Sequence, residues 1–254
     1  MYSDHFLQQI EEAKQPFDGW DFSYVEATGR IQYELLPWSY GSMTHSAANK
    51  AGSILDMGTG GGEFLSIFSK SCKSAIKATE AYEPNVPIAR KQLEPLGIQV
   101  SHISDDHSLP FLKGEFDLVL NRHESYDPAE VKRIMSEGAI FLTQQVGGTD
   151  CNGINAALGK PANLEFSHWN MAFAVEELKN SGFTIVDCKE AFPVQRFYDI
   201  GSLVYYLKAI PWQVPDFSIE KDLDSLYRIH QQLTEDGYFN VYQHRFIIKA
   251  QAKV

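Results

Sequence analysis

The chain has 254 residues, 44% of them hydrophobic, enough for the core of one large domain or of one domain with an insertion. It carries 22 Lys and Arg against 33 Asp and Glu, and the resulting net charge of −11 opposes unaided binding to a nucleic-acid backbone. No apolar run approaches the length of a membrane span, about 18 residues, and the first residues lack the pattern of a signal peptide. The isolated cysteines Cys72, Cys151 and Cys188 favour a reducing, cytoplasmic location and no zinc site.

Residues 1–50 are rich in aromatic side chains, and we predict that they form a helical and aromatic cap packed on the core. An alternative interpretation is a lid over a ligand, with Trp20, Trp38 or Tyr40 facing that ligand.

Residues 51–192 alternate between strand and helix patterns. The predicted strands are Ser53–Met57, Ile76–Thr79, Gln99–Ile103, Phe116–Leu120, Gly138–Val146 and Phe183–Phe192. The predicted helices span 63–70, 84–96 and 173–180, and a further helix begins after residue 127. In the first of them we expect the apolar residues Phe64, Leu65, Ile67 and Phe68 to face the sheet. Such alternation predicts a Rossmann-like α/β fold, a mostly parallel sheet with right-handed crossovers and helices on both faces.

Turn and cap residues mark several helix ends. Asp127, Pro128 and Glu130 occupy the N-cap, N1 and N3 positions of a helix, with Glu130 at the capping-box position. Two helices, Asp199–Ala209 and Ile219–Thr234, are predicted within residues 193–240. We therefore expect a helical insertion there, followed by the last strand of the core within residues 241–254, at about Val241–Ala250.

The most informative segment is the glycine-rich turn after the first predicted strand, which reads Asp56-Met57-Gly58-Thr59-Gly60-Gly61-Gly62. Glycines accept backbone angles that a Cβ atom disfavours, so the strand can turn sharply into a helix. They also let a ligand lie directly against the backbone at the helix N-terminus.

Polar residues follow the next three strands, in order. Glu80 ends the second strand, where a carboxylate can accept hydrogen bonds from both hydroxyls of a ribose. Asp105 and Asp106 follow the third strand, and a carboxylate there can accept from an exocyclic adenine amine. The segment 121–124, Asn-Arg-His-Glu, follows the fourth strand and can reach both a cofactor tail and a substrate. In such sheets ligands bind at the carboxyl ends of the strands, so these residues should meet there.

These motifs make residues 50–190 resemble the class I S-adenosylmethionine-dependent methyltransferases. The resemblance implies a seven-stranded sheet whose last strand is antiparallel and inserted beside the fifth, with S-adenosylmethionine as the cofactor. It further implies that Gly58, Gly60 and Gly62 approach the methionine part of the cofactor and that Glu80 binds the ribose. The remaining roles implied by the resemblance belong to Ala81 and Tyr82 beside the adenine, Asp105 or Asp106 at its amine, and Asn121 near the methionine or methyl group.

A nicotinamide-binding dehydrogenase is disfavoured because its turn needs Gly-x-Gly-x-x-Gly. The sixth position is Glu63 when the pattern starts at Gly58, and Leu65 when it starts at Gly60. Asp56, two residues before Gly58, also favours the methyl donor.

We expect methyl transfer to a small-molecule acceptor. A weak nucleophile would need a base, for which His123 is the first candidate, because histidine titrates near neutral pH, and Glu124 the second. The other interpretation of His123 is a hydrogen bond within its loop. Two alternative functions stay open, a ribosomal or transfer RNA base methyltransferase and a non-catalytic module that binds S-adenosylmethionine.

Overall fold

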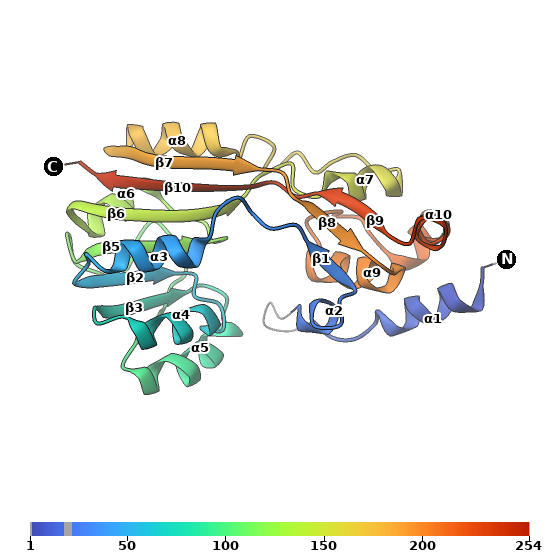
Figure 1. Cartoon of the computed structure of the whole chain (residues 1–254), viewed down its shortest axis with the longest axis horizontal. Coiled ribbons are helices and arrows are strands. Elements are labelled where there is room, and N and C mark those ends of the chain that lie inside the picture. The colour runs from blue at the N-terminus through green and yellow to red at the C-terminus, as the bar shows by residue number, and fades with distance from the viewer. Residues whose placement is uncertain (1, 18–21, 254) are drawn as a thin grey trace. The chain divides into compact units, whose positions relative to one another are not determined.

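The computed structural model describes residues 2–17 and 22–253, so the predicted lid residue Trp20 lies outside the described residues. The chain divides into two compact units (Figure 1). We call residues 37–146, 169–190 and 246–254 the core unit, and residues 1–36, 147–168 and 191–245 the second unit.

The core unit contains a seven-stranded sheet in the order β4-β3-β2-β5-β6-β10-β7. Its strands are β2 (Ser53–Met57), β3 (Ala75–Glu80), β4 (Gln99–His102), β5 (Phe116–Arg122), β6 (Met135–Val146), β7 (Phe183–Ala191) and β10 (Arg245–Ala252). Strands β2 to β6 pair in parallel, whereas β10 runs against its neighbours β6 and β7 (Figure 1). The fold predicted from the sequence is therefore confirmed, including the insertion of the last strand beside the fifth.

Helices cover both faces of this sheet. They are α3 (Tyr40–Ala48), α4 (Glu63–Phe68), α5 (Asn85–Leu93), α6 (Pro128–Ile134) and α8 (Met171–Asn180), with short 3-10 turns at Ser69–Ser71 and Glu94–Leu96. Because side chains alternate along a strand, the sheet supplies one apolar layer to each face. One layer packs against α3, α4 and α5 and the other against α6 and α8.

The capping residues predicted for α6 lie where expected, with one difference. Asp127 accepts hydrogen bonds from the backbone N–H groups of Ala129 and Glu130, and Pro128 begins the helix. Glu130, however, binds the Leu109 N–H and the Arg133 guanidinium. The glutamate of the expected capping box thus holds the loop after β4 onto α6.

The second unit has its own sheet and its own apolar core. Its three strands, in the order β1-β8-β9 and antiparallel, are β1 (Ile31–Tyr33), β8 (Val194–Phe197) and β9 (Phe239–Tyr242). Its helices are α1 (Asp4–Glu12), α2 (Ser23–Glu26), α7 (Asn152–Leu158), α9 (Ile200–Ala209) and α10 (Ile219–Asp236). The two helices of the predicted insertion, α9 and α10, are present.

The boundaries predicted for the cap, the core and the insertion differ from those of the two units. Residues 40–48 of the expected N-terminal cap form α3 on the core sheet, whereas residues 1–36 belong to the second unit. The strand predicted at Phe183–Phe192 is present as β7. Pro193, which has no N–H for a ladder, separates it from β8, a strand that was not predicted. The predicted last strand divides into β9 and β10 at Gln243 and His244, whose N–H groups bind the Pro193 carbonyl and the Asp150 carboxylate.

Among the described residues, no helix combines the length and the apolar character needed to cross a bilayer.

The cap of α6 provides a stability test. We expect Asp127→Ala to lower the free energy of unfolding by about 1 kcal/mol, because two N–H groups at the helix start lose their acceptor. Asp127→Asn keeps a side-chain oxygen and is the matched control. Urea unfolding measures both variants, and equal losses in the two would contradict the assignment of a cap.

Candidate functional site

The predicted site residues meet at one edge of the core sheet. The parallel register pairs Met57, at the end of β2, with Asn121 of β5. On the other side, Asp56 pairs with Ala78, two residues before Glu80. The glycine turn, the end of β3 and the loop after β5 are therefore neighbours, as the sequence predicts.

Three glycines of the turn adopt left-handed backbone angles. Gly58 and Gly60 have φ values of 63° and Gly62 has 89°. A Cβ atom on Gly62 would come within 2.8 Å of Leu93, so this glycine allows α4 to pack closely on α5. A Cβ atom on Gly60 would meet nothing within 4 Å. Gly60 thus faces open space, which a ligand lying on the backbone could fill.

The Glu80 carboxylate lies beneath this turn and connects it to β3. One oxygen accepts from the Gly60 N–H at 2.6 Å and the other from the Tyr82 N–H at 2.8 Å. A carboxylate oxygen has two lone pairs, so each oxygen can accept a second hydrogen bond. Burial raises the pKa of Glu80, and the backbone N–H groups oppose that shift.

Further carboxyl groups gather around the turn. Burial raises the pKa of Asp56 to about 6, Glu80 adds to the shift, and Thr59 and Arg122 oppose it. Burial also raises the pKa of Asp106, whose carboxylate accepts from the Ser125 hydroxyl. Several acids that resist ionisation in one place favour a positively charged ligand, because a cation would relieve their mutual repulsion.

Glu124 lies directly against the turn. A Cβ atom on Gly58 would lie within 2.6 Å of the Glu124 Cβ and Cγ atoms, so the glutamate side chain covers this glycine. Burial raises the pKa of Glu124 to about 7, with further contributions from Glu80 and Asp106. A carboxyl group with a pKa near neutrality is suited to proton transfer at physiological pH.

Asn121 is fully buried and bonded to protein groups. Its side-chain oxygen accepts from the Thr143 hydroxyl at 2.9 Å and from the Gln145 amide at 2.6 Å, and its amide nitrogen donates to the Ser125 carbonyl. Gln145 also donates to the Glu124 carbonyl at 2.9 Å. In the structure these two amides therefore hold the loop that carries Glu124.

The other predicted positions are more exposed. Ala81 and Asp105 lie at the surface, and Asp105 accepts from the N–H of His107. The His123 side chain is exposed, and its Nε2 atom lies 3.0 Å from the Gln144 amide nitrogen.

The structure gives the predicted residue Arg122 its partners and places two further residues, Gln144 and Gln145, at the site. The Arg122 guanidinium lies 5.8 Å from the centroid of the Phe64 ring and lowers the pKa of Asp56. Gln144 and Gln145 hold the loop after β5. A local motif could not identify these glutamines, because their partners lie more than twenty residues away in the chain. Of the predicted lid residues, Trp38 donates to Gln144 and Tyr40 is buried against Phe64.

The fold of the core unit agrees with comparisons to known proteins. Residues 54–145 match a family model described as a methyltransferase domain. This match, to a methyltransferase domain, agrees with the resemblance seen in the sequence. A comparison with curated proteins found no match.

Solved structures of low sequence identity share the fold. A protein of Bacillus halodurans described as a methyltransferase matches with a TM-score of 0.58 and 15% identity, over 85% of this chain and 99% of the other. The YcgJ protein of a Bacillus species matches with a TM-score of 0.57 and 14% identity, over 85% and 98%. A geranyl diphosphate methyltransferase solved with GPP and sinefungin matches with a TM-score of 0.51 and 15% identity, over 83% and 77%.

The raised pKa of Glu124 predicts a pH-dependent effect on stability. An acid whose pKa is higher in the folded state keeps its proton there while the unfolded chain releases it. Its stabilising contribution is therefore present below the unfolded pKa and is lost as the pH rises towards 7. Glu124→Gln cannot ionise, so we expect its thermal midpoint to exceed that of the wild type at pH 8 and to approach it at pH 5.

Thermal unfolding at the two pH values measures this difference. Glu137→Gln changes an exposed glutamate at the opposite end of β6 and serves as the control, which should follow the wild type at both pH values. A Glu124→Gln midpoint that tracks the wild type across the pH range would contradict the proposed burial of a charge.

Proposed function

We propose that this protein binds S-adenosylmethionine at the glycine turn and transfers its methyl group to a small-molecule acceptor. The observation that carries the proposal is the pairing of Gly60, which faces open space, with the Glu80 carboxylate that binds its N–H. When bound, the cofactor supplies a methyl group carried on a positively charged sulfur. After transfer of the methyl group, the sulfur is neutral and the cofactor has become S-adenosylhomocysteine.

The residues of the turn would bind the cofactor through their backbone and the adjoining acids. Gly60 would let the methionine part approach the backbone, as the family pattern implies, whereas Gly58 is covered by Glu124 and the Cβ position of Gly62 is filled by Leu93. The remaining lone pairs of Glu80 would accept from the ribose hydroxyls. The charge of Asp56 suits a cofactor that carries a positive sulfur and an ammonium group.

Residues of the neighbouring loops would complete the site. Ala81 would flank the adenine, and Asp105 or Asp106 would accept from its amine. Asn121 would act indirectly, because its buried side chain bonds to Gln145, and Gln145 in turn holds the loop that carries Glu124.

Glu124 is the better candidate for a general base. It lies against Gly58, which the family pattern places near the methionine part of the cofactor, and burial raises its pKa to about 7. In its ionised form it would take the proton of the acceptor as the acceptor atom attacks the methyl carbon. Positioning of the two reactants would supply much of the remaining rate.

A small molecule is favoured as the acceptor. The net charge of −11 opposes nucleic acid, and two proteins of similar fold are methyltransferases of small molecules, geranyl diphosphate and a phosphorylated ethanolamine. Another neighbour with a TM-score of 0.54 is described as a [4+2]-cyclase, so the fold alone does not define the reaction. Binding and turnover must therefore be measured separately.

The first experiment compares two glycines in calorimetric titrations with S-adenosylhomocysteine. Gly60 and Gly97 both have positive φ angles and open space at the Cβ position, but Gly97 lies at the end of the turn after α5. An alanine at either position costs similar backbone strain, about 1–2 kcal/mol. We expect Gly60→Ala to weaken binding by about tenfold or more, equivalent to about 1.4 kcal/mol, and Gly97→Ala to bind like the wild type.

Equal affinities of the Gly60→Ala variant and the wild type would contradict cofactor binding on this turn. If the wild-type protein binds, incubation with methyl-labelled S-adenosylmethionine and a fractionated metabolite extract tests transfer. Label that appears in no acceptor fraction, despite binding, would favour the non-catalytic alternative.

Glu80 gives a second prediction. Glu80→Ala should weaken binding of S-adenosylhomocysteine by about 1–3 kcal/mol, through the loss of charge-assisted hydrogen bonds. Because the substitution also releases the Gly60 N–H, adenosine and 2′,3′-dideoxyadenosine are compared in both proteins. The wild type should prefer adenosine and the variant should not. A variant that keeps the full preference would exclude Glu80 as the ribose ligand, and Glu83→Ala, at an exposed glutamate, is the control.

A further inference from the structure

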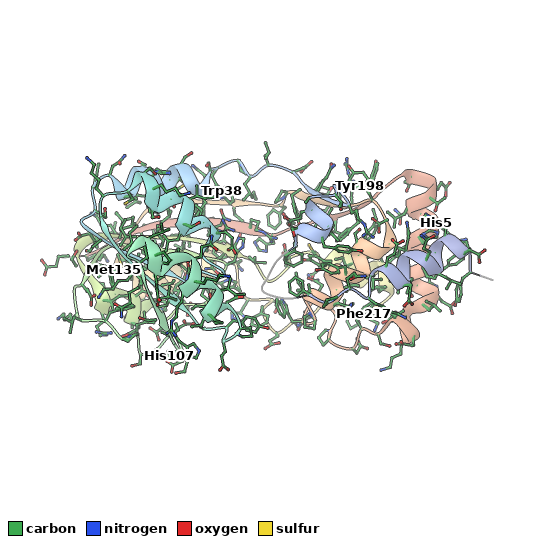
Figure 2. All side chains as sticks on the ribbon, turned by 90° about the horizontal axis from the view of Figure 1, so that it is seen from below. His5, Trp38, His107, Met135, Tyr198 and Phe217 are labelled. Carbon is green, nitrogen blue, oxygen red and sulfur yellow. The ribbon has the colours of Figure 1, made fainter. Side chains whose placement is uncertain are left out.

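Three polar side chains form a chain of contacts beside the loop after β5, and no step of the proposed function uses it. The Trp38 indole N–H, from the segment before α3, donates to the Gln144 side-chain oxygen at 2.8 Å. The Gln144 amide nitrogen lies 3.0 Å from His123 Nε2. All three residues belong to the core unit, and Figure 2 labels Trp38.

The chemistry of these groups determines the direction of each hydrogen bond. An indole N–H can only donate, so the Gln144 atom that meets Trp38 must be its oxygen. The amide end of Gln144 that faces His123 is therefore the NH2 group, which also can only donate. His123 Nε2 must accept with its lone pair, and the proton of the neutral ring is then on Nδ1.

The backbone keeps the histidine in this place. The His123 N–H donates to the Gln144 carbonyl at 2.8 Å, one residue beyond the last pair of the β5–β6 ladder, Arg122 and Gln144. His123 has a φ angle of 63°, a left-handed conformation that is uncommon for residues with a Cβ atom. Two hydrogen bonds to the same residue hold it in this conformation, which directs its ring towards the buried Gln144 side chain.

Protonation of His123 at Nε2 would break this arrangement. The new N–H would face the NH2 group of Gln144, and neither group could accept. Rotation of the amide would satisfy His123 but would then direct the same NH2 group at the Trp38 N–H. The Trp38 indole therefore disfavours the protonation that a general base acting through Nε2 requires.

We propose that Gln144, oriented by Trp38, is a positioning residue that holds the His123 imidazole neutral, with its proton on Nδ1. His123 then carries its N–H group at Nδ1, and the base role passes to Glu124. The role at a methyl-acceptor site rests on the proposed function, whereas the tautomer of His123 does not.

The tautomer is measured by long-range proton–nitrogen correlation spectra of histidine-labelled full-length protein at pH 8. Protonated and unprotonated ring nitrogens have well separated shifts, and His123→Gln identifies the signals of His123. In the wild type we expect the proton on Nδ1. Gln144→Glu replaces the amide by a carboxylate, which accepts from both neighbours, so we expect the proton to move to Nε2 in this variant.

Trp38→Phe removes the indole N–H and keeps a ring, so the Gln144 amide can rotate and the fraction of His123 with its proton on Nε2 should rise. Trp169→Phe, in the same unit but packed against Tyr126, Phe173 and Phe246, should leave the wild-type signals unchanged. A wild-type proton on Nε2, or Gln144→Glu signals identical to those of the wild type, would overturn the proposal.

A binding measurement on the same samples separates this inference from the proposed function. If the tautomers behave as expected and S-adenosylhomocysteine does not bind, the proposed function fails and the positioning by Gln144 stands. If the ligand binds and the proton of His123 is on Nε2, the positioning proposal alone fails. In an active enzyme, Gln144→Glu should lower kcat several-fold with the affinity for S-adenosylhomocysteine unchanged.

Discussion

The hydrogen bonds of Glu80 connect the two halves of the candidate site. β2 and β3 are neighbours in the sheet, but the turn after β2 has no ladder partner of its own beyond the Thr59 N–H, which binds the Thr79 carbonyl. The Glu80 carboxylate extends this contact by accepting from Gly60 and Tyr82 at once. A buried carboxylate needs such donors, and a partly buried N–H group such as that of Gly60 needs such an acceptor. The Glu80 carboxylate and these N–H groups thus satisfy each other's hydrogen bonding, and together they form the surface on which we propose that the ligand binds.

Burial of the acids around this turn disfavours their charged forms and so destabilises the protein when no ligand is bound. Asp56, Glu80, Asp106 and Glu124 all have raised pKa values, and burial is the main cause for each. Of these four acids, only Asp56 has its pKa lowered in part by Arg122. Such a concentration of unfavourable charge is typical of functional sites, where a bound ligand supplies what the protein lacks. The proposed positively charged cofactor is consistent with these raised pKa values.

Features that depend on local sequence were predictable, and features that depend on distant partners were not. The glycine turn, Glu80 and the caps of α6 follow from backbone angles and hydrogen-bonding groups within a few residues. Ile67 was expected to face the sheet but is 71% exposed, because Leu65 and Phe68 lie three residues apart on the buried face and Ile67 lies opposite. The contacts of Gln144 with Trp38 and His123 join segments that only the folded sheet brings together. The two-unit division was missed for the same reason, since a short strand such as β1 has too few residues for a clear period.

The position of β10 in the sheet affects how the chain folds during translation. β7 is synthesised before β10, its neighbour in the sheet among the described strands, and the residues of β8, α9, α10 and β9 come in between. Until β10 arrives, β6 and β7 each present an unpaired edge of backbone groups, and direct pairing of these two strands would give a non-native sheet. Early folding of the second unit would shorten this exposure, because it would bring the start of β10 back towards the end of β7 while translation is still under way.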